Sequence, residues 1–131
     1  MLLDTSGLMC LYDKRDRRHA DAQRVYRATG QRVTHGYVLA EFQALANARG
    51  APRAEALRFV ETLLDNPDVE VVWVDEILHR AAVSFLQARL DKTYSLCDAV
   101  SFLLMQQRGI TDALTTDRHF EQAGFVRLLK S

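Results

Sequence analysis

The sequence lacks the features that mark secreted, membrane-spanning or disulfide-rich proteins. Only two of its 131 residues are cysteine, Cys10 and Cys97, and both stand in apolar stretches. This usage is typical of free thiols in a reducing compartment. No apolar run reaches the roughly 18 residues of a membrane span, and no basic segment opens the chain as in a secretory signal. We therefore expect a cytoplasmic protein with no membrane attachment.

The sequence also lacks an excess of either charge. Lys and Arg together number 17, as do Asp and Glu, so the formal net charge is zero. A strong, non-specific nucleic-acid binder would be clearly basic, but an enzyme with an acidic site and a basic rim remains possible. Arginines concentrate between Arg15 and Arg27. A solvated helix face explains them most simply, and a phosphate-binding rim is the alternative.

The chain alternates short apolar runs with longer helical patterns, and its length suits one domain over 1–131. Strands are predicted at 1–4, 32–34, 69–74, 113–115 and 125–129. Helices are predicted at 6–13, 17–29, 37–48, 52–65, 76–90, 96–108 and 118–123. Left-handed helix ends are predicted at Gly30, Gly50, Gly109 and Gly124. This alternation favours an α/β fold in which helices cover both faces of a mostly parallel sheet.

Four acidic residues stand where an ordinary core would not place them. Asp4 and Asp117 follow predicted strands, whereas Glu41 and Asp98 lie among apolar residues of predicted helices. Each has a simpler explanation. Asp4 and Asp117 could be helix caps, Asp98 could belong to a capping box that begins at Ser95, and Glu41 could be exposed.

The helical wheel favours a shared site instead. Asp98 falls between Phe102 and Met105, inside the apolar stripe of its helix, and Glu41 lies at the shoulder of its own stripe. Carboxyl ends of parallel strands meet at one edge of a sheet, where ligands bind. Carboxylates gathered there need a counter-charge, because buried unpaired charges are costly. Oxygen ligands suit a hard cation such as Mg²⁺ or Mn²⁺.

The segments around these acids resemble the motifs of PIN-domain ribonucleases. The matching segments are 1–6 (Met-Leu-Leu-Asp-Thr-Ser), 40–42 (Ala-Glu-Phe), 94–102 (Tyr-Ser-Leu-Cys-Asp-Ala-Val-Ser-Phe) and 114–120 (Leu-Thr-Thr-Asp-Arg-His-Phe), followed by Ala-Gly-Phe at 123–125. They occur in the family's order and spacing over the whole chain. Within the family, the sequence is most similar to the VapC-like toxin ribonucleases of toxin–antitoxin pairs.

The resemblance implies a three-layer α/β/α sandwich and Mg²⁺- or Mn²⁺-dependent hydrolysis of RNA. It makes Asp4, Glu41, Asp98 and Asp117 the catalytic, metal-binding acids. It offers hydroxyl groups for hydrogen bonds to the ligands or the substrate, from Thr5, Ser6, Ser95 and Thr116. It also implies a cognate antitoxin protein and a homodimer, for which the apolar parts of 6–13 and 37–64 would supply the shared face.

Other functions stay open at this point. A phosphatase of the strand-end aspartate type would want a second Asp two residues after Asp4, where this chain has Ser6. A receiver domain would want a strand-end lysine. A stand-alone housekeeping nuclease and a non-catalytic PIN-like RNA-binding module are the remaining alternatives. His119 is better explained as a helix-start residue than as a phosphate ligand, and Trp73 is predicted to lie in the core.

Overall fold

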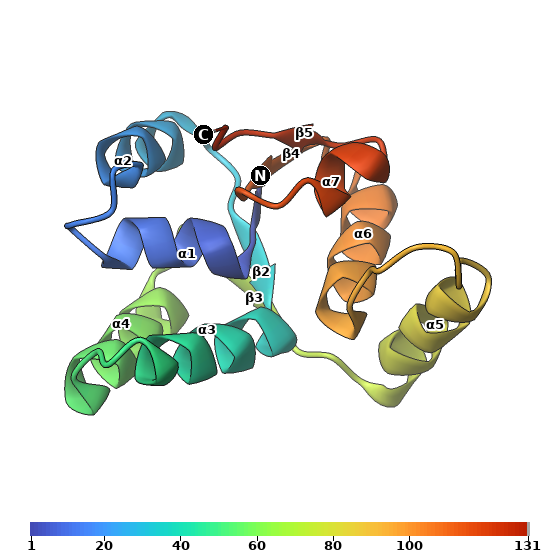
Figure 1. Ribbon diagram of the computed structural model, residues 1–131, viewed down its shortest axis with the longest axis horizontal. Coiled ribbons are helices and arrows are strands. Elements are labelled where there is room, and N and C mark those ends of the chain that lie inside the picture. Colours follow the sequence, from blue (N-terminus) through green and yellow to red (C-terminus); the bar gives the residue numbers. More distant parts are fainter. Residues whose placement is uncertain (131) are drawn as a thin grey trace.

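A central parallel sheet organises the computed structural model, which describes residues 1–130 (Figure 1). Its five strands lie in the order β3-β2-β1-β4-β5, and every paired neighbour is parallel. The strands are β1 (Leu2–Leu3), β2 (Val33–His35), β3 (Glu70–Val72), β4 (Asp112–Leu114) and β5 (Val126–Arg127). Since β1 lies in the middle of this order, the chain begins at the centre of the sheet.

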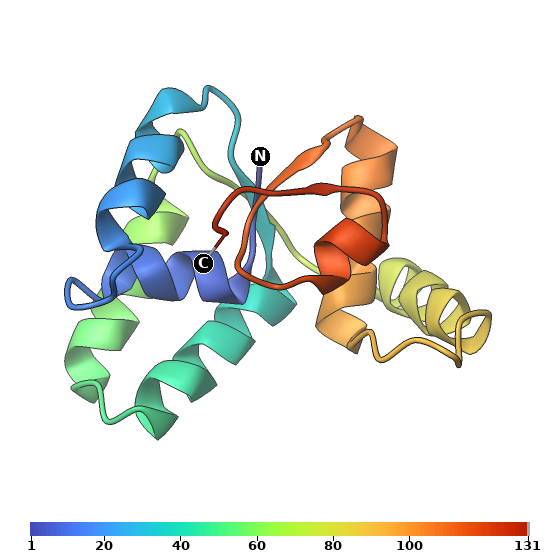
Figure 2. The ribbon, with the colours of Figure 1, turned by 45° about the horizontal axis from the view of Figure 1, so that its top comes forward.

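Seven helices among the described residues form the outer layers. They are α1 (Thr5–Tyr12), α2 (His19–Ala28), α3 (Gly36–Ala48), α4 (Arg53–Asp65), α5 (Glu76–Gln87), α6 (Leu96–Arg108) and α7 (His119–Gln122). Figures 1 and 2 show α1 to α4 on one side of the strands and α5 to α7 on the other. The expected three-layer α/β/α sandwich with a mostly parallel sheet is therefore confirmed, and in residues 1–130 the sheet is entirely parallel.

Alternation along the strands supplies both cores. Leu3 and Leu114 pack with α1, α3 and α4 on one face, whereas Leu2 and Ala113 pack with α6 and α7 on the other. The second core centres on Phe102, whose ring is fully buried. Because adjacent strand residues point to opposite faces, two residues of β1 suffice to anchor both helical layers.

Two sequence expectations about the ends of elements are wrong. Trp73 is 65% exposed rather than buried, because β3 ends at Val72 and Trp73 begins the connection to α5. Gly30 was expected to take a left-handed conformation, but only Gly50, Gly109 and Gly124 have positive φ among the described residues. Helix α2 ends differently, since Thr29 leaves it in an extended conformation and its hydroxyl donates to the carbonyl of Val25.

Both cysteines are free and buried. Within residues 1–130, no helix has the length and apolarity that crossing a membrane would require.

Candidate functional site

A cavity of about 410 Å³ opens at the carboxyl edge of the sheet. All four predicted acids and all four predicted hydroxyl residues line it, together with two further residues. The lining residues are Asp4, Thr5, Ser6, Glu41, Leu45, Ser95, Asp98, Thr116, Asp117 and His119. The fold thus brings four distant segments to one place, and the chemical roles of these residues stay predictions.

Asp4 is held inside the protein rather than used as a cap. It precedes α1, yet its carboxylate makes no capping hydrogen bond and is only 5% exposed as a residue. The hydroxyl of Thr115 donates to its Oδ2 at 2.7 Å. Burial first, and then the negative charges of Asp98 and Asp117, raise the pKa of Asp4 to about 7, against the lowering effect of the Thr115 hydrogen bond. Asp4 is therefore the N-cap residue of α1 by position, but its side chain does not cap the helix, and its charged form needs a cation nearby.

Asp98 combines both explanations that the sequence left open. It closes a capping box with Ser95, because each residue's side chain accepts a hydrogen bond from the other's backbone N–H. Its Oδ2 also lies 2.9 Å from Nδ1 of His119. Both contacts use Oδ2, and no hydrogen bond to Oδ1 occurs within residues 1–130. The carboxylate is therefore fixed through one oxygen, which leaves the other for a ligand.

His119 joins the two acids nearest to it. Its Nδ1 lies 2.9 Å from Asp98 Oδ2 and 3.5 Å from Asp117 Oδ1, and its Nε2 lies 3.0 Å from the hydroxyl of Thr93. Carboxylates accept but do not donate when ionised, so Nδ1 carries the proton that Asp98 accepts. Its backbone N–H donates to Asp117 Oδ1 at 2.9 Å, but the N-cap of α7 is Arg118, so Asp117 lies one residue before the cap position weighed from the sequence.

Glu41 lies at the rim of the cavity. It projects from α3, it is exposed, and its side chain makes no hydrogen bond within the described residues. Its exposure agrees with the simpler explanation, yet it faces the same cavity as the other acids. Glu121, on α7, does not line the cavity and pairs with Arg127 at 2.8 Å.

Hydroxyl groups form hydrogen bonds between the segments that follow β1 and β4, next to the acids. Ser6 Oγ lies 3.1 Å from Thr115 Oγ1 and accepts from the backbone N–H of Thr116 at 2.9 Å. Thr115 Oγ1 accepts from the backbone N–H of Asp117 at 3.0 Å. Thr5 Oγ1 is buried and has no hydrogen-bond partner within residues 1–130. Ser6 and Thr115 thus set the position of the loop that carries Asp117.

Sequence reasoning missed the contributions of Thr115 and His119. Thr115 follows β4 directly, at the same edge as Asp4, and its hydroxyl reaches an acid 111 positions away. His119 stands two residues after Asp117, a spacing that offered the only local signal for it. Both contacts depend on which strands are neighbours, and the sequence pattern alone does not fix that order.

The donor set fits a divalent cation. One ligand atom from each of Asp98, Asp117 and His119 lies within 4.8 Å of the other two. Asp4 and Glu41 line the same cavity outside this tight group. Carboxylate oxygens suit Mg²⁺ or Mn²⁺. Both ring nitrogens of His119 already contact Asp98 and Thr93, so His119 positions the carboxylates rather than binding the ion. The raised pKa of Asp4 and the unpartnered hydroxyl of Thr5 are further signs that these groups fit a cation.

Comparison with known proteins agrees with this geometry over the whole chain. A family model described as "PIN domain" matches residues 1–126. The chain is 33% identical over 129 residues to "23S rRNA-specific endonuclease VapC20" of Mycobacterium tuberculosis strains CDC 1551 / Oshkosh and H37Rv, and the match covers 98% of this chain and 97% of the relative.

Solved structures show the same likeness. The crystal structure of M. tuberculosis VapC20, described as a "Sarcin-Ricin loop cleaving toxin", has a TM-score of 0.86 at 31% identity, with 95% of each chain covered. A toxin–antitoxin complex from Klebsiella pneumoniae shares the fold at a TM-score of 0.70 and 17% identity, over 99% of this chain and 98% of that chain. With this family model over residues 1–126 and these relatives, the chain belongs to the PIN-domain family.

Proposed function

We propose that this protein is a divalent-metal-dependent endoribonuclease and the toxin half of a toxin–antitoxin pair. The observation that carries the proposal is the single cavity lined by Asp4, Glu41, Asp98 and Asp117 at the carboxyl edge of the sheet. Similarity to a toxin endonuclease over 98% of the chain supports it. A phosphatase or receiver domain has no such support.

In this proposal the four acids hold Mg²⁺ or Mn²⁺ and Asp98 is the best-fixed ligand. The bound ion would neutralise charge on the scissile phosphate and lower the pKa of the attacking water. The protein's own part is to hold the ligands in place. Thr115 orients Asp4, and the Ser95 backbone and His119 orient Asp98. Thr5 is free to hydrogen-bond substrate or water at the cavity wall.

The substrate we propose is a loop of ribosomal RNA. VapC20 is named for its action on 23S rRNA, and its structure is described as that of a toxin that cleaves the sarcin–ricin loop. The 33% identity over nearly the full length supports a related substrate for this chain. Action on ribosomal RNA places the proposed activity in the cytoplasm.

The partner we propose is a co-encoded antitoxin that shuts off the site. Four carboxylates around one cavity give it a strong negative potential when no cation is bound. An Arg or Lys from a flexible partner segment would form charge-assisted hydrogen bonds with these carboxylates. Such a segment orders on binding, so its affinity would depend on additional apolar contacts.

Cleavage of purified ribosomal RNA tests the proposal. The wild type should cut at discrete positions with Mg²⁺ or Mn²⁺, should be inactive in EDTA, and should be inhibited by its co-encoded neighbour. Asp98→Asn should lose more than about a hundredfold in rate, whereas Asp112→Asn, at the opposite edge of the sheet, should match the wild type. RNA binding without cleavage would identify a non-catalytic module. Cleavage that no neighbouring gene product inhibits would identify a stand-alone nuclease.

A further inference from the structure

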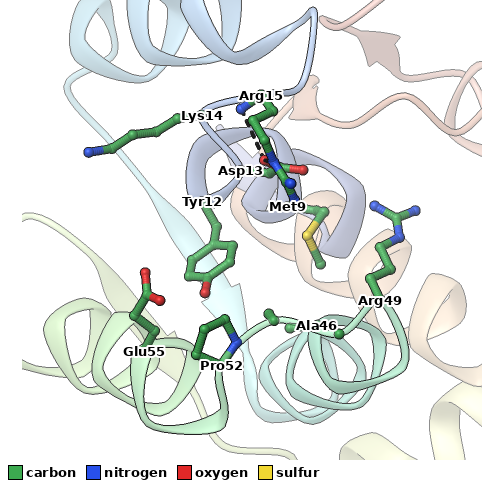
Figure 3. A pocket seen from close by; sticks show the side chains of 11 residues that line it. Met9, Tyr12, Asp13, Lys14, Arg15, Ala46, Arg49, Pro52 and Glu55 are labelled. Carbon is green, nitrogen blue, oxygen red and sulfur yellow. Dashed lines mark hydrogen bonds and ion pairs between the residues drawn. The ribbon is translucent and has the colours of Figure 1, made fainter.

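Three cavities adjoin one another along the outside of α1 and α3. The acidic cavity shares Ser6, Leu45 and Thr116 with a smaller one of about 80 Å³. The smaller cavity shares Met9 and Arg49 with a third of about 480 Å³, drawn in Figure 3. The shared residues place the three cavities side by side, and we call this row of cavities the α1–α3 groove.

Helical periodicity gives the groove its direction. Glu41, Leu45 and Arg49 follow one another at intervals of four residues and line successive cavities. At 1.5 Å per residue they span about 12 Å of helix. Ser6 and Met9, three residues apart on α1, also line successive cavities, and α1 packs directly against α3. The groove therefore leads from Glu41 in the acidic cavity to Arg49, in a part where basic residues stand among Asp13, Asp16 and Glu55.

Two arginines in the groove have unused hydrogen-bonding capacity. Arg18 lines the small cavity, and its Nε is buried without a hydrogen-bond partner in residues 1–130. Arg49 lines both the small and the large cavity, and its guanidinium makes no hydrogen bond or ion pair within the same residues. Arg15, by contrast, is engaged with Asp13 at 3.4 Å. A guanidinium group can donate two parallel hydrogen bonds to one phosphate. Arg18 and Arg49 are therefore suited to binding an RNA backbone.

The large cavity combines apolar walls with polar and charged groups. Its apolar walls come from Met9, Ala46, Ala51 and Pro52, and it carries the hydrogen-bonding groups of Tyr12 and Glu55. Figure 3 shows the Tyr12 hydroxyl directed toward Pro52, with Glu55 and Arg49 at opposite ends of the cavity. Its volume of about 480 Å³ lies within the usual range for small-ligand pockets. An unstacked nucleobase suits this combination of groups.

We propose that the α1–α3 groove binds the RNA strand on one side of the scissile phosphate. Arg18 and Arg49 contact the adjoining backbone phosphates, and one unstacked base of that strand enters the large cavity. This proposal rests on the proposed function, since it uses the acidic cavity as the cleavage site. The proposal also changes which residues form the basic rim that was expected between Arg15 and Arg27. Of those arginines, only Arg15 and Arg18 line the groove, and Arg49 joins them although the sequence did not predict it.

Cleavage kinetics on an RNA hairpin with the sarcin–ricin loop sequence test the groove. Arg18→Gln and Arg49→Gln should each raise KM about tenfold and leave kcat near the wild-type value, because contacts outside the cleavage site contribute uniform binding. Each should also reduce the slope of log(kcat/KM) against log[KCl] by about 0.7, the value for one phosphate contact on a single strand. The Mn²⁺ affinity of both variants, measured by calorimetry, should equal that of the wild type.

Matched controls separate the groove from the proposed function. Arg58→Gln, on the exposed face of α4, removes the same charge outside the groove and should leave KM and the salt slope unchanged. Hairpins that each lack one nucleobase test the large cavity as a base site. The wild-type KM should rise only for the hairpin whose missing base lies at one position beside the cleaved bond.

If the wild type cleaves RNA and the groove variants behave like Arg58→Gln, the groove proposal is overturned and the nuclease proposal stands. If the groove variants bind the co-encoded partner more weakly but cleave RNA with unchanged kinetics, the groove proposal is also overturned, and the groove is instead a binding site for the partner protein. If the wild type cleaves no RNA, the proposed function itself fails.

Discussion

Asp98 performs two tasks that sequence reasoning treated as alternatives. One oxygen completes the capping box of α6 and meets His119, and the other carries no hydrogen bond within the described residues. A helix N-terminus also favours a negative charge. The same backbone that stabilises the carboxylate thus presents it to the cavity, so a structural role and a site role do not compete at this residue.

Replacing Asp98 with Asn should leave the metal-free protein folded and at least as stable as the wild type. The amide oxygen can still accept from the Ser95 backbone, and the change removes one of the charges that raise the pKa of Asp4. Thermal melting in EDTA should give a midpoint equal to or above that of the wild type. Added Mn²⁺ should raise the wild-type midpoint but not that of the variant. A variant that melts lower in EDTA and still gains from Mn²⁺ would contradict this role.

His119→Gln should weaken Mn²⁺ binding by about ten- to a hundredfold, which is the usual effect of losing a group that orients a metal ligand. His119 contacts Asp98 at 2.9 Å and is itself anchored to Thr93 at 3.0 Å, so its loss frees the ligand to move. Titration calorimetry measures the affinity. His79→Gln, a histidine that contacts Tyr37 away from the cavity, is the control. Equal Mn²⁺ affinity in both variants would count against the orienting role.

The raised pKa of Asp4 predicts a stability that falls with pH when no metal is bound. An unfolded Asp4 releases its proton near pH 4, but the folded carboxyl keeps its proton up to about pH 7. Between these values the unfolded state binds fewer protons, so the free energy of unfolding falls as pH rises and then levels off. Urea denaturation in EDTA from pH 4.5 to 8 measures this slope. Asp4→Asn should flatten it, and an unchanged slope would assign the dependence to other groups.

At the scale of elements, local signals predicted the order of strands and helices, while contacts across the sheet decided the rest. Left-handed glycines at Gly50, Gly109 and Gly124 each follow a helical run, but so does Gly30, which has no positive φ, so the local pattern was right at three of four positions. The exposure of Trp73 could not be predicted from the sequence, since a Val-rich strand and the connection after it look alike. The hydrogen bond from Thr115 to Asp4 depends on β1 and β4 being neighbours, which no local pattern specifies.

Gly7 sets how closely α1 approaches β4. A Cβ atom at this position would lie 2.0 Å from the carbonyl oxygen of Leu114, a backbone atom that cannot move aside. Gly7→Ala should therefore lower the free energy of unfolding by about 3 kcal/mol or more, above the usual cost of overpacking. Gly30→Ala is the control, because a Cβ there meets nothing within 4 Å. Chemical denaturation of both variants measures the difference, and equal stabilities would refute the close approach.

At the scale of the molecule, the topology explains why distant acids meet. β1 and β4 are adjacent and parallel, so the residues that follow them, Asp4 and Asp117, emerge at the same edge. The sequence predicted this edge from the α/β alternation, and the family resemblance is confirmed by the match over residues 1–126. The expected dimer face stays a prediction. Four of the eight residues of 6–13 are buried in the chain's own core, whereas 37–64 keeps Leu57 and Leu64 exposed at 46% and 36%.

A homodimer is still expected, through the connection that follows β3. Trp73 is 65% and Ile77 81% exposed, beside an edge strand whose outer side is unpaired within the described residues. Burying both side chains against a second copy removes exposed apolar surface. Sedimentation at micromolar concentration should show a dimer, and the single tryptophan should shift its emission to longer wavelength as dilution dissociates the dimer.

Ile77→Glu should give a monomer. Leu90→Glu, equally exposed at 84% but beyond the end of α5, should remain dimeric. A wild type that sediments only as a monomer, or a Trp73 emission unchanged by dilution, would rule out this interface.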